Sequence, residues 1–136
     1  MADWNQQIID EFRANDGTVT TMGFGRGLVL LHHRGARTGA ERVTPLGAIR
    51  DDEKSWLIAA SAGGSPAHPA WYHNLLAHPD VSIETPDDGT VDVRAEELLD
   101  DDRDEVWDRF KAMSAGFAEY ERKASRVIPV FRLTRR

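Results

Sequence analysis

The sequence predicts one antiparallel β-barrel domain with helices on its flanks, and three observations support this prediction. At 136 residues the chain is long enough for one hydrophobic core and short for two domains. Six short segments have strand-like patterns, and the helical segments do not alternate with them as they do in a parallel α/β sheet. We therefore expect a single domain over residues 1–136, with residues 1–16 as an N-terminal helical arm, six strands and three helices.

The predicted strands are apolar or alternating runs bounded by turn residues. Residues 28–31 are continuously apolar, as in a buried strand, whereas residues 81–85 and 90–95 alternate apolar and polar residues, as in a half-buried hairpin. Pro45 cannot donate a ladder hydrogen bond, so we expect it at an edge or a bulge. The six strands are expected at residues 28–31, 42–50, 55–60, 81–85, 90–95 and 130–134.

The predicted helices carry apolar residues at spacings of three and four. Trp4, Ile8 and Phe12 predict a short helix at the N-terminus. A second helix is expected over residues 69–77, where Pro69 suits the first turn because amide protons there lack partners within the helix. One further amphipathic helix is predicted near the C-terminus from the stripe Val106, Phe110, Met113, Phe117 and Tyr120.

Composition excludes several classes of function. Hydrophobic residues make up 40% of the chain and charged residues 29%, which indicates a folded protein, and the net charge of -6 argues against nucleic acid as a partner. Because no cysteine occurs, disulfides, thiolate nucleophiles and iron–sulfur clusters are excluded. No apolar run approaches the ~20 residues that span a bilayer, and no leader-like segment opens the sequence, so we expect a cytoplasmic protein.

Two segments, residues 34–46 and 59–75, contain more glycine, proline and polar residues than a plain barrel needs. In the second, a predicted strand runs through Gly63-Gly64 into a helix, so unpaired amide protons and the positive helix end can converge on an anion such as a phosphate. In the first, Arg37 and Arg42 flank a turn and could grip the same phosphate or carboxylate. Taken singly, each feature is explained as well by an unusual turn or by ordinary surface charge.

The histidines do not predict a metal site. Three of them are spaced by five residues and fall on different faces of a helix, and two are adjacent in a strand and point to opposite sides. A serine hydrolase is equally unsupported, because Ser61 does not lie in a G-x-S-x-G turn. What remains is a site of arginines, backbone amides and aromatic rings, which suits a cofactor that brings its own chemistry.

Read together, the two segments follow a long pattern, G-R-x-[ST]-G-x-x-R-x-x-P-L and then A-S-x-G-G-x-x-x-x-P-x-W-Y-x-N-L. The matching residues are Ala36-Arg37-Thr38-Gly39, Arg42, Pro45-Leu46, Ala60-Ser61, Gly63-Gly64, Pro69, Trp71-Tyr72 and Asn74-Leu75. In this the chain resembles the deazaflavin-dependent nitroreductase family, also called coenzyme F420-dependent quinone reductases. The similarity runs from about Leu28 to Glu84 and continues more weakly at Arg126-Val127-Ile128-Pro129.

The resemblance implies a split β-barrel of the kind that binds flavin mononucleotide (FMN), with reduced coenzyme F420 in a groove. It implies that Arg37 and Arg42 hold the anionic part of the cofactor, and that Tyr120 and Ser61 act near the reacting atoms. Ala62 stands where many relatives have lysine, and Phe117 where they have tyrosine. The cofactor-binding residues that the resemblance implies are Ala36, Arg37, Thr38, Arg42, Val43, Thr44, Pro45, Leu46, Gly47, Ala59, Ala60, Ser61, Ala62, Gly63, Gly64, Ala70, Trp71, Tyr72, His73 and Asn74.

The activity that the resemblance implies is hydride transfer from reduced coenzyme F420 to a quinone-like, nitro or enone acceptor. Two alternatives stay open: a reductase that uses FMN on the same barrel, and a non-catalytic carrier of a fatty acid or another lipid. The expected partners are a small-molecule electron acceptor and a second copy in a homodimer, because split barrels often pair across their open side. Weak proximity to membranes is expected if the quinone is a lipid, without any segment that spans one.

Overall fold

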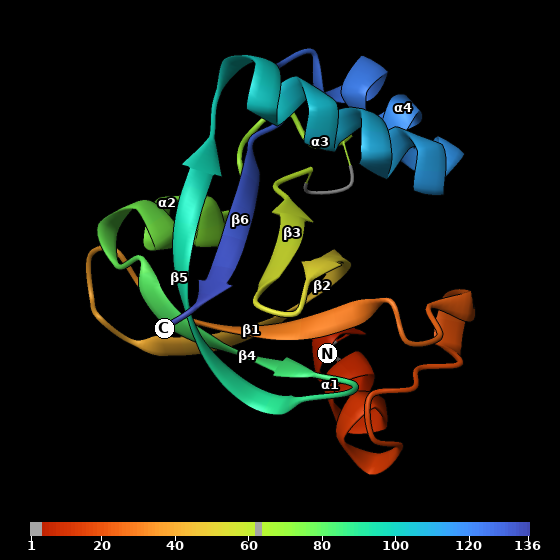
Figure 1. The fold of residues 1–136 in the computed structure, drawn as a ribbon, viewed down its shortest axis with the longest axis vertical. Coiled ribbons are helices and arrows are strands. Elements are labelled where there is room, and N and C mark those ends of the chain that lie inside the picture. The colour runs from red at the N-terminus through yellow and green to blue at the C-terminus, as the bar shows by residue number, and fades with distance from the viewer. Residues whose placement is uncertain (1–3, 62–63) are drawn as a thin grey trace.

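Helices and strands follow each other in nearly the predicted order. The computed structural model describes residues 4–61 and 64–136 (Figure 1). The helices are α1 (Trp4–Ala14), the short 3-10 helix η1 (Thr21–Gly23), α2 (Ala70–Ala77), α3 (Asp100–Met113) and α4 (Ala115–Ala124). The strands are β1 (Leu28–Arg34), β2 (Glu41–Asp52), β3 (Ser55–Ala59), β4 (Asp80–Thr85), β5 (Gly89–Leu98) and β6 (Val130–Arg135).

The strands close into one antiparallel barrel in the order β1-β2-β3-β6-β5-β4, which confirms the predicted fold class. The ladder between β2 and β3 covers only part of β2. Residues 48–52 of β2 pair with β3, whereas residues 41–47 pair with β1 alone. Pro45 lies in this one-sided half, opposite Leu30, so its predicted edge position is confirmed. The barrel is therefore split on one side.

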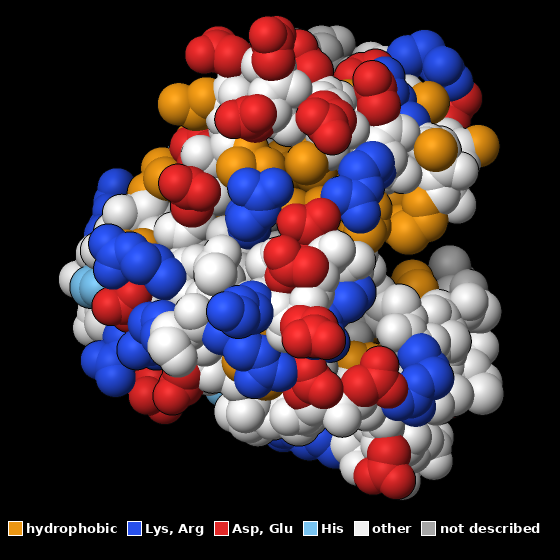
Figure 2. Space-filling model, in the orientation of Figure 1, with side chains coloured by type: hydrophobic (Ala, Val, Ile, Leu, Met, Phe, Trp, Pro, Cys, Tyr) orange, Lys and Arg blue, Asp and Glu red, His pale blue; other side chains and the backbone are white. Residues whose placement is uncertain are grey.

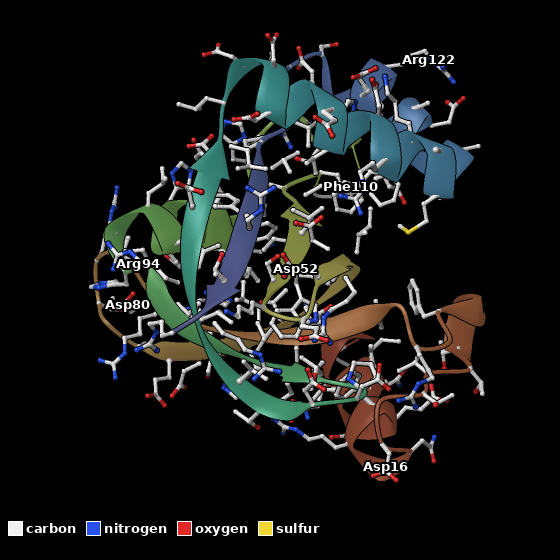
Figure 3. All side chains as sticks on the ribbon, viewed as in Figure 1. Asp16, Asp52, Asp80, Arg94, Phe110 and Arg122 are labelled. Atoms are coloured by element: carbon white, nitrogen blue, oxygen red, sulfur yellow. The ribbon has the colours of Figure 1, made fainter. Side chains whose placement is uncertain are left out.

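Alternating residues of the strands pack inward and outward. Along β1, Val29 and Leu31 belong to the interior of the barrel, while Leu28 and Leu30 pack outside it against α1. On another outer face, α3 covers β3, and Figure 3 shows Phe110 beneath α3 on the side of the barrel. The two flanking helices thus bury two outer faces, and both lie beside the split.

The C-terminal stripe does not form one helix, and this prediction is wrong. Ser114 has an extended backbone (φ -151, ψ 128), and its side chain accepts a hydrogen bond from the amide of Gly116, so it ends α3 and caps α4. Met113, which the stripe places in the core, is 53% exposed. The described chain therefore has four α-helices where three were expected. The break turns Phe117 and Tyr120 back toward the barrel, where they pack beside α3.

Candidate active site in the split of the barrel

A cavity of about 480 Å³ lies where β2 and β3 separate, a volume within the range of cofactor and small-molecule sites. In Figure 2, hydrophobic side chains lie on both sides of a hollow between the half of the molecule that carries α3 and α4 and the half that carries α1. The residues that line the cavity are Asn5, Phe24, Thr44, Pro45, Leu46, Gly47, Ala59, Ser61, Pro69, Trp71, Phe117 and Tyr120. Eight of these are among the cofactor-binding and catalytic residues that the resemblance implies: Thr44, Pro45, Leu46, Gly47, Ala59, Ser61, Trp71 and Tyr120. Pro69 and Phe117 are also named in the sequence comparison, as a motif residue and as a departure from the relatives.

One wall of the cavity is the free edge of β2. Since residues 44–47 have β1 on one side only, the backbone groups that point the other way face the cavity without a sheet partner. Pro45 adds no donor there, and Gly47 adds no side chain. Such an edge can form hydrogen bonds with the polar rim of a flat heterocycle while leaving room for its ring.

The opposite wall is aromatic and comes from α4. The ring of Tyr120 meets that of Phe117 edge-on, with centroids 5.8 Å apart, and Phe117 in turn packs edge-on against Phe110 at 5.2 Å and Trp107 at 5.8 Å. Trp107 and Phe110 are buried. This chain of contacts fixes the Tyr120 side chain at the cavity and offers a flat apolar surface to a ligand.

A buried polar network ties the two sequence motifs together behind the cavity. The Asn74 carboxamide oxygen accepts a hydrogen bond from the amide of Ala36 at 2.9 Å, so its nitrogen faces Nδ1 of His33, also at 2.9 Å. Nδ1 must then accept, and Nε2–H of His33 donates to the Thr44 hydroxyl at 2.9 Å. The network fastens β1, β2, α2 and the turn after β1 to one another.

This network requires a neutral imidazole. Protonation would place a second N–H of His33 against the Asn74 amino group, and the imidazole is only 4% exposed. Burial, and then the positive charges of Arg42 and His32, together lower the pKa of His33 to about 4. His33 is therefore a structural base that stays uncharged at neutral pH.

Arg37 and Arg42 lie at the end of the β1–β2 hairpin that this network anchors. Both side chains are exposed, and neither has a hydrogen bond or ion pair with any residue in the described part of the chain. Arg42 shares a face of β2 with Thr44, two residues or about 7 Å along the strand. Its guanidinium group is thus placed next to the cavity and is free to meet an anion.

Several residues implied by the resemblance lie outside the cavity lining. Val43 packs beneath α1, and Ala60 is fully buried in the barrel interior. Asn74 uses its side chain in the buried network, and Ala70 is exposed in the first turn of α2. For these four residues a contact with the cofactor stays a prediction.

Tyr72 and His73 also point away from the cavity lining. The Tyr72 ring packs edge-on against Phe131 at 5.7 Å, and its hydroxyl donates to the Glu97 carboxylate at 3.4 Å. Burial, and then Glu97, raises the pKa of Tyr72, so this hydroxyl keeps its proton. His73 is exposed. Ala36 and Thr38 lie in the exposed turn beside Arg37, whereas Ala62 and Gly63 lie outside the described residues.

Gly64 is the described half of the predicted glycine turn. Its φ of +86 is a conformation that few other residues adopt, which agrees with the predicted unusual turn. A Cβ at this position would come within 3.0 Å of the Lys123 side chain, so α4 approaches this turn closely.

Sequence reasoning misses two of the lining residues, Asn5 and Phe24. Nothing in the local pattern marks Asn5, because it reaches the cavity only through the docking of α1. Phe24 does carry a signal: it is a large aromatic residue between two glycines, and it remains 39% exposed in the fold. It stands at the rim of the cavity rather than in a core.

Two negative findings concern the whole described part of the chain. Within it, no group of three or more histidine or acidic side chains is arranged to hold a metal ion. Likewise, none of its helices has the length and apolar character needed to cross a bilayer.

Comparison with known proteins gives consistent matches. A family model described as F420H(2)-dependent quinone reductase matches residues 4–135. The F420H(2)-dependent quinone reductase Rv1261c of Mycobacterium tuberculosis is 41% identical over 110 residues, which are 79% of this chain and 73% of that protein. A solved F420-H2 dependent reductase, FDR-A, has a TM-score of 0.70 and 36% identity, covering 79% of this chain and 94% of its own. A structure described as a domain-swapped dimer has a TM-score of 0.72 and 32% identity, covering 96% and 97%.

Proposed function

The chain belongs to the F420H2-dependent quinone reductase family, and we propose that it holds the deazaflavin ring of F420 in the cavity at the split of the barrel. It is an oxidoreductase whose cofactor is coenzyme F420. Family membership thus favours F420 over FMN, and an enzyme over a lipid carrier. The observation that supports this location is that residues of both sequence motifs and Tyr120 of α4 line one cavity, although they are far apart in the chain.

The residues present fit such a cofactor. The free edge of β2 at residues 44–47 can bind the polar rim of the ring, and Trp71 and Leu46 supply apolar contacts at the same cavity. Arg37 and Arg42 carry positive charge with no partner in the described part of the chain, which suits the phosphate and the anionic tail. Thr44 keeps its hydroxyl in the His33 network, so it acts through its backbone.

The quinone would enter between the ring and the aromatic wall of α4. When bound, reduced F420 supplies a hydride, and the quinone needs one further proton to become the hydroquinone. Tyr120 and Ser61 are the two hydroxyl side chains at the cavity that are positioned to donate that proton or to hold a water that does. The half-exposed Phe24 at the rim gives the acceptor an apolar path, as a lipid-soluble quinone requires.

The direct test mixes the purified protein with reduced F420 and menadione and follows the return of the oxidised deazaflavin spectrum. We expect turnover well above the rate in buffer and no turnover with reduced FMN in place of F420. A panel of nitro and enone acceptors then defines the acceptor range. Absence of acceleration with menadione and with every member of the panel would contradict the proposed function.

We also propose that the protein forms a homodimer across its open side. A structurally similar protein is described as a domain-swapped dimer, which supports a pairing of two copies of this fold. Light scattering after size exclusion should give twice the monomer mass of 15.2 kDa. A monomer at all concentrations up to those of the activity assay would exclude this assembly.

A further inference from the structure

Arg126 lies in the connection between α4 and β6, and its side chain binds one segment of the chain with all three of its nitrogen atoms. Nε donates to the carbonyl of Ser65 at 3.1 Å, and Nη2 donates to the carbonyls of Ala60, Ser61 and Ala67 at 3.1, 3.3 and 3.2 Å. Nη1 pairs with Nδ1 of His68 at 3.0 Å. Every acceptor belongs to residues 60–68, the segment that links β3 to α2.

This segment needs an external donor. Its described residues, 60–61 and 64–68, contain no strand and no α-helix, so few of their carbonyl groups have a regular backbone partner. A guanidinium group offers five N–H donors in a rigid plane, which matches several carbonyls at once; a lysine ammonium does not. The identity of the residue as arginine, rather than its charge alone, therefore matters here.

The backbone on either side of Arg126 is itself firmly held. Ser125 takes the left-handed conformation (φ 54) that ends α4, and Ile128 is fully buried. The carbonyl of Pro129 accepts a hydrogen bond from the amide of Ala60 at 2.8 Å. Arg126 thus projects from a fixed point, and its side chain can impose a position on the segment it binds.

The position of that segment decides the shape of the cavity. Ser61, near the start of the segment, and Pro69, the residue that follows its end, line the cavity, as does Trp71 two residues further on. On the other side, the chain that carries Arg126 continues directly from α4, whose Phe117 and Tyr120 form the aromatic wall. Arg126 therefore links the segment that carries Ser61 to the aromatic wall proposed for the acceptor.

We propose that Arg126 is a positioning residue for F420 binding: its guanidinium group holds residues 60–61 and 65–68 at the distance from the β2 edge that the deazaflavin ring requires. This inference rests on the proposed function. No carboxylate lies within ion-pair distance of Arg126 in the described part of the chain, so its charge also stays unneutralised beside the site. The residue touches neither cofactor nor acceptor and acts through the backbone it binds.

The test compares Arg126→Lys, Arg126→Ala and the control Arg122→Ala. Arg122 lies four residues earlier, in α4, is exposed and pairs only with Glu119 among the described residues. The affinity for oxidised F420 is measured without acceptor from the quenching of tryptophan fluorescence. We expect Arg126→Lys to weaken binding on the order of tenfold and Arg126→Ala by more, with Arg122→Ala unchanged. The KM for menadione at saturating F420 should change less than the affinity for F420.

Hydrogen exchange of the cofactor-free protein tests separately whether Arg126 holds the segment in place, apart from its effect on F420 binding. The amide of Gly64, bonded to Ser61, and that of Ala67 should exchange faster in both Arg126 variants and at the wild-type rate in Arg122→Ala. Suppose that the wild-type enzyme binds F420 and turns over, and that Arg126→Lys binds F420 equally tightly. This result would overturn the role of Arg126 and leave the proposed function intact. A wild-type protein that binds no F420 would overturn both.

Discussion

Lowering the pH from 7 to 4 should destabilise the fold through His33. In the unfolded chain this histidine takes up a proton near its ordinary pKa of 6.5, whereas burial in the Thr44–His33–Asn74 network lowers the pKa in the folded protein to about 4. Between these values the unfolded state binds more protons than the folded state, so stability falls as the pH falls. Above pH 6.5 both states are neutral, and His33 has no effect on the pH dependence.

The size of the effect follows from the shift. One pKa unit corresponds to about 1.4 kcal/mol, so the lowering from 6.5 to about 4 predicts a loss of about 3 kcal/mol by pH 4. Carboxylates such as Glu84 and Asp51 also have lowered pKa values and add their own loss at low pH. A comparison with a variant that cannot titrate at this position removes their contribution.

The assay is urea unfolding of the wild type and of His33→Gln at pH 7, 6, 5 and 4. Glutamine keeps a donor and an acceptor but carries no charge at any of these pH values. The wild type should be the more stable protein at pH 7, and its advantage should shrink by about 3 kcal/mol by pH 4. Two stability curves that stay parallel over the whole range would refute the neutral, buried role of His33.

Four further substitutions test the site and the fold. Arg37→Ala and Arg42→Ala should each weaken F420 binding by about tenfold while leaving the affinity for a tail-free deazaflavin unchanged, as measured by titration calorimetry; equal losses for both ligands would contradict an anion-binding role. Tyr120→Phe should lower kcat for menadione by about 100-fold at unchanged F420 affinity, and an unaltered kcat would leave Ser61 or water as the proton source. Phe110→Ala, at a side chain that is 0% exposed between α3 and the barrel, should cost about 3–5 kcal/mol in urea unfolding, and a loss below 1 kcal/mol would contradict the packing described.

Local patterns predict most of this fold because most of its signals are local. The alternation at 81–85 and 90–95 and the apolar run at 28–31 correspond to β4, β5 and the start of β1. Pro45 predicts an edge position because the missing amide proton is a property of proline itself and needs no information from the rest of the chain. The C-terminal stripe misleads because its spacing is regular, while the break at Ser114 depends on a single cap that periodicity does not weigh.

The candidate site is predictable only in part, because local patterns do not show which residues meet in space. The motif segments mark the edge of β2, Ser61 and Trp71, all of which line the cavity. The patterns do not distinguish a residue that faces the cavity from one that holds the wall in place. Asn74 and Tyr72 belong to the second kind. Asn5 belongs to α1, which is distant in sequence from the other residues that line the cavity. Short-range spacing does not predict that α1 packs there.

The half of β2 that lacks a second neighbour has a consequence for solubility. An open strand edge is a template on which another chain can build a sheet, and proteins commonly protect such edges with charge and proline. Here that protection is built in: Glu41 and Arg42 stand exposed at one end of the edge, and Pro45 interrupts the row of donors in its middle. Pro45 therefore has two effects: it helps to leave the edge open to a small ligand, and together with Glu41 and Arg42 it makes the edge a poor place for a foreign strand to add.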